Sequence, residues 1–308
     1  MLTVVSPVYR ARDCVDELCQ RLTAACANIT DRFEVILVDD ACPENSWELI
    51  ERQAERDERI KGIRLVRNFG QHHAVTAGLD HARGEWVVVM DCDLQEAPEE
   101  IPRLYAKATE EGHLCVMARR TERKDNWFKT LQSKLFYRLF SYLTDLKELN
   151  GTVTNFGIAH RQVIDQIVGL REASRFYPGF LFWLGYPTAF VEVQHHTRFA
   201  GDTSYTFLKL LQHSRDIILA YSTKPLTLCV MLGAIVATGA FLTGTLYFFW
   251  VLLFGTQVTG WPSLMITLLF SVGILVTTLG MVGLYVGRVL VEVKGRPIYV
   301  IRKSTFDA

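Results

Sequence analysis

The amino-acid sequence predicts a protein of the α/β class, in which a doubly wound sheet domain is followed by interfacial helices and a two-helix transmembrane hairpin. Three observations lead to this prediction. Strand and helix signals alternate over residues 1–115, and acidic residues follow two of the expected strands. No charged residue and no histidine occurs between Leu226 and Gly287. With 308 residues, the chain is long enough for one domain and a membrane anchor.

The elements of the first part follow each other in a regular order. We expect strands in short apolar runs rich in β-branched residues, namely LTVVSPVY, FEVILVDDA, IKGIRLVRN and GEWVVVMDCD. We expect helices in the segments between and after them, namely CVDELCQRLTAAC, SWELIERQAERD and HHAVTAGLDHA. Apolar strands that alternate with helices form a mostly parallel sheet with helices on both faces.

Acidic residues stand at the ends of two of these strands. Asp39 and Asp40 end the second, and Asp91 and Asp93 end the fourth. Ligands of open sheets bind beyond the carboxyl ends of the strands, so we expect both motifs in one site. The spacing of Asp91 and Asp93 lets them face the same way, and Gln95 adds an oxygen, which suits Mg²⁺ or Mn²⁺. Because acids after a strand also cap helices and solvate turns, this motif alone does not establish a metal site.

Charge and cysteine content exclude several classes of protein. Lys and Arg total 33, as do Asp and Glu, so no overall basic field favours nucleic acid as a partner. The seven cysteines include no CxxC pair, which indicates a reducing compartment rather than a disulfide framework or a zinc site. The N-terminal segment MLTVVSPVYRARD reads as a strand and not as a signal peptide, so we expect the first domain in the cytosol.

The second part contains two uncharged runs, Leu226–Phe254 and Ser263–Gly287. Each exceeds the roughly 20 apolar residues that span a bilayer. The alternative is a buried helical hairpin in a soluble core. Lys224 precedes the first run, and five cations follow the second: Arg288, Lys294, Arg296, Arg302 and Lys303. By the positive-inside rule both ends of the hairpin lie in the cytosol.

Residues 205–221, just before the first run, carry apolar side chains at helical spacing. This segment fits an interfacial helix and an ordinary amphipathic core helix equally well. Small residues within the first run, Gly233, Gly239 and Gly244, are suited to helix packing between protomers, so a homo-oligomer is a further expectation.

Four segments together resemble a known family: VVSPVY, EVILVDDA, RNFGQHHAVTAGLDHARGE and VVVMDCDLQEAPEEI. They are similar to the family 2 inverting glycosyltransferases of the dolichyl-phosphate mannose synthase type. The resemblance continues to the tail YVGRVLVEVKGRPIYV. It is greatest to the bacterial branch that loads glucose or 4-amino-4-deoxyarabinose onto undecaprenyl phosphate.

The resemblance implies a nucleotide-sugar-binding, GT-A-like domain over residues 1–200. Juxtamembrane helices would follow at 201–225, the two spans at 226–287, and a cytosolic tail at 288–308. The implied activity is metal-dependent, inverting transfer from a nucleotide sugar, expected to be a UDP-sugar, to polyprenyl phosphate. It would take place at the cytosolic face of the inner (plasma) membrane, with Mg²⁺ or Mn²⁺ as cofactor.

The family pattern also implies roles for matched residues. Residues expected to bind the donor are Pro7, Tyr9, Asp39, Asp40 and Arg67. For Arg67, pairing with an Asp of the site is an equal alternative. Residues expected to hold the metal and the diphosphate are Asp91, Asp93 and Gln95. Residues expected to cradle the acceptor phosphate are Arg119, Lys129 and Ser133, with Lys129 in place of a more usual Arg. Arg198 would close over the donor phosphates.

Several positions depart from that pattern. Arg10-Ala11 replaces Asn-Glu, Ala41-Cys42 replaces Gly-Ser, and Thr203-Ser204-Tyr205 replaces Ser-Lys-Tyr. Most important for the chemistry, Asn155 stands where many relatives carry the Asp that is assigned as catalytic base. Asparagine cannot accept a proton at neutral pH.

The acceptor decides whether that loss matters. A phosphate monoester with a second pKa of about 6 is largely anionic at pH 7 and needs no base, whereas a sugar hydroxyl would need one. Two alternatives stay open at this point. One is an enzyme of the same fold that acts on another membrane-bound saccharide, and the other is a non-catalytic lipid-binding or transport partner.

Overall fold

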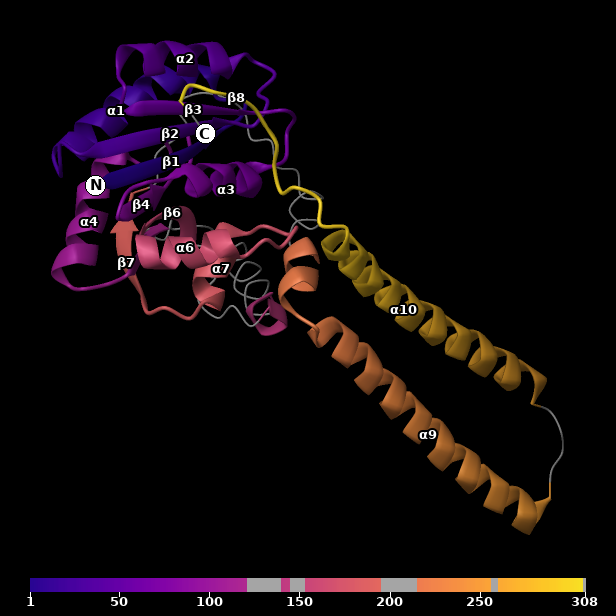
Figure 1. Cartoon of the computed structure of the whole chain (residues 1–308). Coiled ribbons are helices and arrows are strands. Elements are labelled where there is room, and N and C mark those ends of the chain that lie inside the picture. Colours follow the sequence, from indigo (N-terminus) through magenta and orange to yellow (C-terminus); the bar gives the residue numbers. More distant parts are fainter. Residues whose placement is uncertain (121–139, 145–152, 195–214, 256–259, 307–308) are drawn as a thin grey trace. The chain divides into compact units, whose positions relative to one another are not determined.

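The computed structural model of the chain describes residues 1–120, 140–144, 153–194, 215–255 and 260–306. The chain divides into two compact units (Figure 1). The sheet unit comprises Met1–Tyr142, Leu146–Leu210 and Pro297–Ala308. The hairpin unit comprises Leu143–Asp145 and Leu211–Arg296.

The sheet unit is built on an eight-stranded sheet with the order β7-β5-β6-β4-β1-β2-β3-β8. The strands are β1 (Leu2–Val8), β2 (Phe33–Asp39), β3 (Ile60–Leu65), β4 (Trp86–Val89), β5 (Cys115–Arg120), β6 (Val153–His160), β7 (Thr188–Val193) and β8 (Ile301–Ser304). The first four strands pair in parallel, as the alternation of strand and helix signals predicts. β6 is antiparallel to both β4 and β5, and β8 is antiparallel to β3.

Helices cover both faces of the sheet. In chain order they are η1 (Arg12–Cys14), α1 (Val15–Ala27), α2 (Ser46–Arg56), α3 (Gln71–His81), η2 (Pro98–Glu100), α4 (Ile101–Glu110), α6 (Arg161–Gly169) and α7 (Tyr177–Trp183). α1 contacts α2 and α4 on one face, whereas α3 contacts α6 and α7 on the other. Since β1 and β2 are covered from both sides, every one of their residues is buried, as in the inner strands of parallel sheets.

Helix α3 lies unusually close to the sheet. A Cβ atom at Gly78 would stand 2.3 Å from Cγ1 of Val5 and 3.2 Å from Cγ2 of Val38. Only a residue without a side chain permits this approach. The close packing fixes the position of α3 and therefore of its first residue, Gln71, at the carboxyl ends of the parallel strands.

The C-terminal residues complete the sheet. Ser304 of β8 pairs with Ile63 of β3, and the amide of Thr305 donates to the carbonyl oxygen of Gly62 at 3.0 Å. Just before β8, the hydroxyl of Tyr299 donates to Asp80 of α3 at 2.5 Å. The segment expected only as a cytosolic tail thus belongs in part to the sheet unit.

The hairpin unit contains two long helices, α9 (Lys224–Phe254) and α10 (Trp261–Val293), which contact each other (Figure 1). Their apolar stretches have mean hydropathies of 2.1 and 2.2, and 0% of each is buried. At 31 residues, α9 is about 46 Å long, more than the roughly 30 Å of a hydrocarbon core. A core helix of a soluble protein would be mostly buried, so length, composition and exposure together indicate membrane association.

Candidate active site

The carboxyl ends of β1, β2, β3 and β4 meet at one edge of the sheet. Val8 pairs with Asp39, and Asp39 pairs with Arg64, so the segments that follow these strands start side by side. β4 lies on the other side of β1, and Asp91 is the second residue after it, following Met90. The chain reverses its direction of winding between β1 and β4, which is where ligands of doubly wound sheets bind.

The first acid pair, Asp39 and Asp40, is buried. Backbone amides donate to three of its four carboxylate oxygens, and the fourth, Asp39 Oδ2, has no hydrogen-bond partner among the described residues. Asp39 Oδ1 accepts from the amide of Cys42 at 2.8 Å, and its Oδ2 lies 3.3 Å from Nε of Arg64. Asp40 accepts from two amides, those of Phe69 at 2.7 Å and Gly70 at 2.8 Å. Burial raises the pKa of both carboxyls, and these amides oppose the shift.

These contacts suggest a supporting role for the first acid pair. Both oxygens of Asp40 are engaged by the loop before α3, and Asp39 is 0% exposed. From the sequence, both residues are expected to contact the donor, and this stays a prediction. In the structure Asp40 also positions the backbone at Gly70, the residue before α3, whose φ is +101°.

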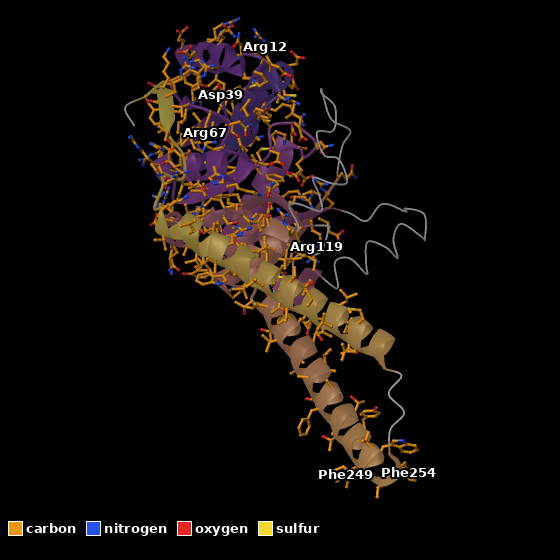
Figure 2. The ribbon with its side chains drawn as sticks, turned by 90° about the vertical axis from the view of Figure 1, so that its right-hand side faces the viewer. Arg12, Asp39, Arg67, Arg119, Phe249 and Phe254 are labelled. Carbon is orange, nitrogen blue, oxygen red and sulfur yellow. The ribbon has the colours of Figure 1, made fainter. Side chains whose placement is uncertain are left out.

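The other expected donor residues line the same edge. Pro7 is buried within β1, whereas Tyr9 is 40% exposed, with the guanidinium carbon of Arg10 5.6 Å from its ring centroid. The guanidinium carbon of Arg67, a residue labelled in Figure 2, lies 4.1 Å from a ring centroid, that of Phe69. Two departures from the family pattern meet here, because the amide of Arg10 donates to Sγ of Cys42 at 3.1 Å.

The second acid group surrounds Asp91. Asp91 Oδ1 accepts from Nε2 of Gln71 at 2.5 Å and from Nδ2 of Asn155 at 3.4 Å. Asp93 Oδ1 accepts from the amide of Gln95 at 3.2 Å, so the three expected metal residues share one short loop. Burial, and then the nearby charge of Asp93, raise the pKa of Asp91 to about 6. A carboxyl in this position favours a cation that restores its charge.

Glu96 is a member of this group that sequence analysis missed. It is 4% exposed, its Oε1 lies 3.8 Å from Arg120, and its Oε2 has no hydrogen-bond partner among the described residues. Burial, and then the charge of Asp91, raise its pKa to about 8. Burial alternates along the loop, with Cys92, Leu94 and Glu96 buried. The alternation of apolar residues after Asp91 was the signal that could have found it.

The cations expected for the acceptor are only partly described. Arg119 of β5, a residue labelled in Figure 2, has its guanidinium carbon 3.9 Å from the ring centroid of Phe190. Its neighbour Arg120 is the arginine that approaches the acid group, because adjacent residues of a strand face opposite sides. The remaining expected residues, Lys129, Ser133 and Arg198, lie outside the described residues.

The acid group fits Mg²⁺ or Mn²⁺ in part. Its donors are hard carboxylate oxygens, and one of them, the buried Oε2 of Glu96, has no hydrogen-bond partner among the described residues. Within the described residues, no three His, Cys, Asp or Glu side chains are already assembled as a complete metal site. This is the pattern of Mg²⁺ sites that use one or two carboxylates and take further oxygens from substrate phosphates.

Comparison with known proteins agrees with this arrangement. Residues 3–167 match the family model described as glycosyl transferase family 2. An uncharacterised glycosyltransferase of Bacillus subtilis (strain 168) is 35% identical over 98% of this chain and 93% of its own length. The undecaprenyl-phosphate 4-deoxy-4-formamido-L-arabinose transferase of Proteus mirabilis (strain HI4320) is 34% identical over the same shares.

A solved structure supports the fold. The glucosyl-3-phosphoglycerate synthase of Mycobacterium tuberculosis, in complex with Mn²⁺, uridine diphosphate and glucosyl-3-phosphoglycerate, superposes with a TM-score of 0.52. The match covers 71% of this chain and 77% of that one at 18% identity, which supports the expected GT-A-like sheet. The length of the sequence match and the identity to full-length relatives establish the family. The chain belongs to glycosyl transferase family 2 and is a glycosyltransferase.

Proposed function

We propose that this enzyme transfers a sugar from a nucleoside-diphosphate sugar, expected to be a UDP-sugar, to polyprenyl phosphate, with inversion at the anomeric carbon. The observation that carries the proposal is the P. mirabilis relative, which aligns over 98% of this chain, apolar helices included, and acts on undecaprenyl phosphate by name. The two long apolar helices are consistent with an acceptor that resides in a membrane.

The surroundings of Asn155 support a phosphate as acceptor. Its amide donates toward Asp91, so this position contributes a neutral group and no proton acceptor. A phosphate acceptor is anionic near neutral pH and can attack without losing a proton first. One of its oxygens forms the bond to the anomeric carbon, and the nucleoside diphosphate leaves with the electron pair of the bond that breaks.

We propose roles in binding the donor, the metal and the acceptor for the following residues. Tyr9 offers an exposed ring for the base of the donor, and Arg67 a cation for its phosphates. Asp91, Asp93 and Gln95 would hold Mg²⁺ or Mn²⁺, which when bound offsets the charge of the leaving diphosphate. Arg119, Lys129 and Ser133 are proposed for the acceptor phosphate, and Arg198 for closure over the donor.

We place the reaction at the cytosolic face of the inner membrane. Cations flank the uncharged stretch on both sides, with Lys224 before it and Arg288 after it. The positive-inside rule therefore puts both chain segments that adjoin the hairpin in the cytosol, where nucleotide sugars are found.

The test is transfer of labelled sugar from a panel of nucleotide sugars to undecaprenyl phosphate, with the full chain in detergent. We expect a glycolipid that forms with Mg²⁺ or Mn²⁺ and not with chelator, and that shows an inverted anomeric configuration by NMR. Arg103→Ala, which removes an exposed ion pair on α4, serves as the control variant.

Two outcomes would change the proposal. Retained configuration would exclude direct attack by the acceptor. Transfer to a membrane-bound saccharide, with none to the lipid phosphate, would favour the second acceptor class and leave the identity of the base to be explained.

A further inference from the structure

Two uncharged amides converge on one carboxylate oxygen of the acid group. Nε2 of Gln71 lies 2.5 Å from Oδ1 of Asp91, and Nδ2 of Asn155 lies 3.4 Å from the same atom. The two donors come from different elements, α3 and β6, which approach Asp91 from separate parts of the fold. Among the described residues, both side-chain hydrogen bonds to Asp91 therefore end on Oδ1 and not on Oδ2.

Gln71 is held in place by its own supports. The carboxylate of Asp40 accepts from the amides of Phe69 and Gly70, the two residues that precede α3. The helix itself is fixed through Gly78, which permits van der Waals contact with Val5. Gln71 thus starts a helix that is anchored at its beginning and along its length. Its backbone position is therefore fixed when its side-chain amide donates to Asp91.

Asn155 approaches from the neighbouring strand. Val89, the last residue of β4, pairs with Gly157 of β6, and the strands run antiparallel. Asn155 lies two residues before Gly157 in β6 and, because the strands are antiparallel, it is opposite the segment that follows β4, where Asp91 is found. Its position depends on strand register and is independent of α3.

We infer that Gln71 and Asn155 are positioning residues that bind one oxygen of Asp91, so that its other oxygen faces the cation accompanying the donor diphosphate. The inference rests on the proposed function. Amides suit this task because they orient a carboxylate without adding a positive charge that would compete with the cation. An arginine or lysine at either position would neutralise Asp91 and lower its value as a ligand.

This role differs from that of the Asp usually found at the position of Asn155. A carboxylate there would lie next to Asp91, whose loop already carries the acids Asp93 and Glu96. Asn155 donates a hydrogen bond to Asp91, whereas a carboxylate at this position would repel Asp91. In this chain the position serves the ligand carboxylate rather than the acceptor.

The test measures cation affinity rather than turnover. The full chain in detergent, with uridine diphosphate present, is titrated with Mn²⁺, and free Mn²⁺ is followed by electron paramagnetic resonance. The variants are Gln71→Met and Asn155→Leu, which keep size and remove the amide. The matched control is Gln53→Met, because Nε2 of Gln53 donates to Oδ1 of Asp16 at 2.6 Å on the exposed surface of α2.

We expect Gln71→Met to raise the Mn²⁺ dissociation constant by about 10-fold or more, the usual effect of removing a partner of a metal ligand. Asn155→Leu should have a smaller effect in the same direction, since its contact is longer. Gln53→Met should leave the constant unchanged. Saturating Mn²⁺ should restore most of the transfer rate of both site variants, which loss of a substrate contact would not allow.

A folded Gln71→Met protein with wild-type Mn²⁺ affinity would overturn the inference. If that variant does not fold, Asn155→Leu decides in its place, and an unchanged dissociation constant would again overturn it. A wild-type protein that binds no Mn²⁺ beside uridine diphosphate would remove the metal-dependent function itself, and the inference with it.

Discussion

At the end of β2, three backbone amides and an arginine surround Asp39 and Asp40. At the end of β4, two neutral side-chain amides donate to Asp91, the backbone amide of Gln95 donates to Asp93, and the partly exposed Arg120 lies 3.8 Å from Glu96. Burial raises the pKa of carboxyls in both groups, so the direction of the shift does not separate them. The two groups differ in the hydrogen-bond partners of their carboxylate oxygens. Asp40, whose two oxygens are both occupied by backbone amides, supports the fold, whereas the acids that crowd together after β4 provide a place for a cation.

The largest effect should follow from a change in the second group. Asp93→Ala should lower the rate of transfer by about 10²–10³-fold, because it removes charge stabilisation of the leaving group. Without metal its melting temperature should stay close to that of the wild type, since a half-buried carboxylate beside other acids adds little to stability. Thermal unfolding and a transfer assay on the same preparation check both statements. If the Asp93→Ala variant unfolds instead, Asp93 stabilises the fold, as we propose for Asp40.

The same kind of change in the first group should act on stability. Asp40→Asn leaves one of two partly buried amides without an acceptor, which costs about 1 kcal/mol of unfolding free energy, the lower end of the range for a buried donor. The apparent melting temperature of the sheet unit should fall accordingly. Transfer should fall less than in Asp93→Ala, and through displacement of Gln71. Unchanged stability with lost transfer would instead make Asp40 a contact of the donor.

The pH dependence of the metal-free protein should reveal the second group directly. The pKa values of Asp91 and Glu96, about 6 and about 8, lie above those of unfolded carboxyls, near 4. Protonated forms therefore favour the fold, and this stabilisation is complete below about pH 4 and lost as the pH rises through 6 and 8. Glu96→Gln should remove the decrease in unfolding free energy that ionisation of Glu96 causes.

Melting curves in chelator measure this difference. The melting temperature of Glu96→Gln relative to the wild type should rise between pH 6 and 8. Parallel curves over this range would mean that Glu96 is not the group whose ionisation opposes folding. Added Mn²⁺ should reduce the difference, because a bound cation favours the ionised carboxylates.

A third carboxylate supplies the smallest expected effect. Asp80, further along α3, accepts from Arg171 at 2.8 Å and from Tyr299. Asp80→Asn should lower the unfolding free energy by about 1 kcal/mol, since Arg171 is half exposed and its ion pair is screened by water. Transfer should stay at the wild-type rate. A loss of transfer without a loss of stability would mean that Asp80 contributes to the active site around Asp91.

Sequence patterns were sufficient for the order of the first four strands and the helices between them, because each strand is a short apolar run and each helix has its own spacing. They also placed Asp91, Asp93 and Gln95 in one loop, whose role in metal binding stays a prediction. They did not identify Gln71, Glu96 or Arg120. The contact of Gln71 with Asp91 depends on how α3 packs on the sheet, and that of Arg120 depends on the register of a distant strand. Neither leaves a local pattern.

The pairing of β8 with β3 has a consequence for biosynthesis. In the chain β8 follows both apolar helices, so the ribosome makes it after the segments that are suited to membrane insertion. Until then the backbone groups along the outer side of β3 have no strand to bind, and an open strand edge invites pairing with other chains. A chain that ended between the helices and β8 would leave the outer edge of β3 unpaired. The sheet that carries the active site therefore reaches its final form only after translation has passed the membrane hairpin.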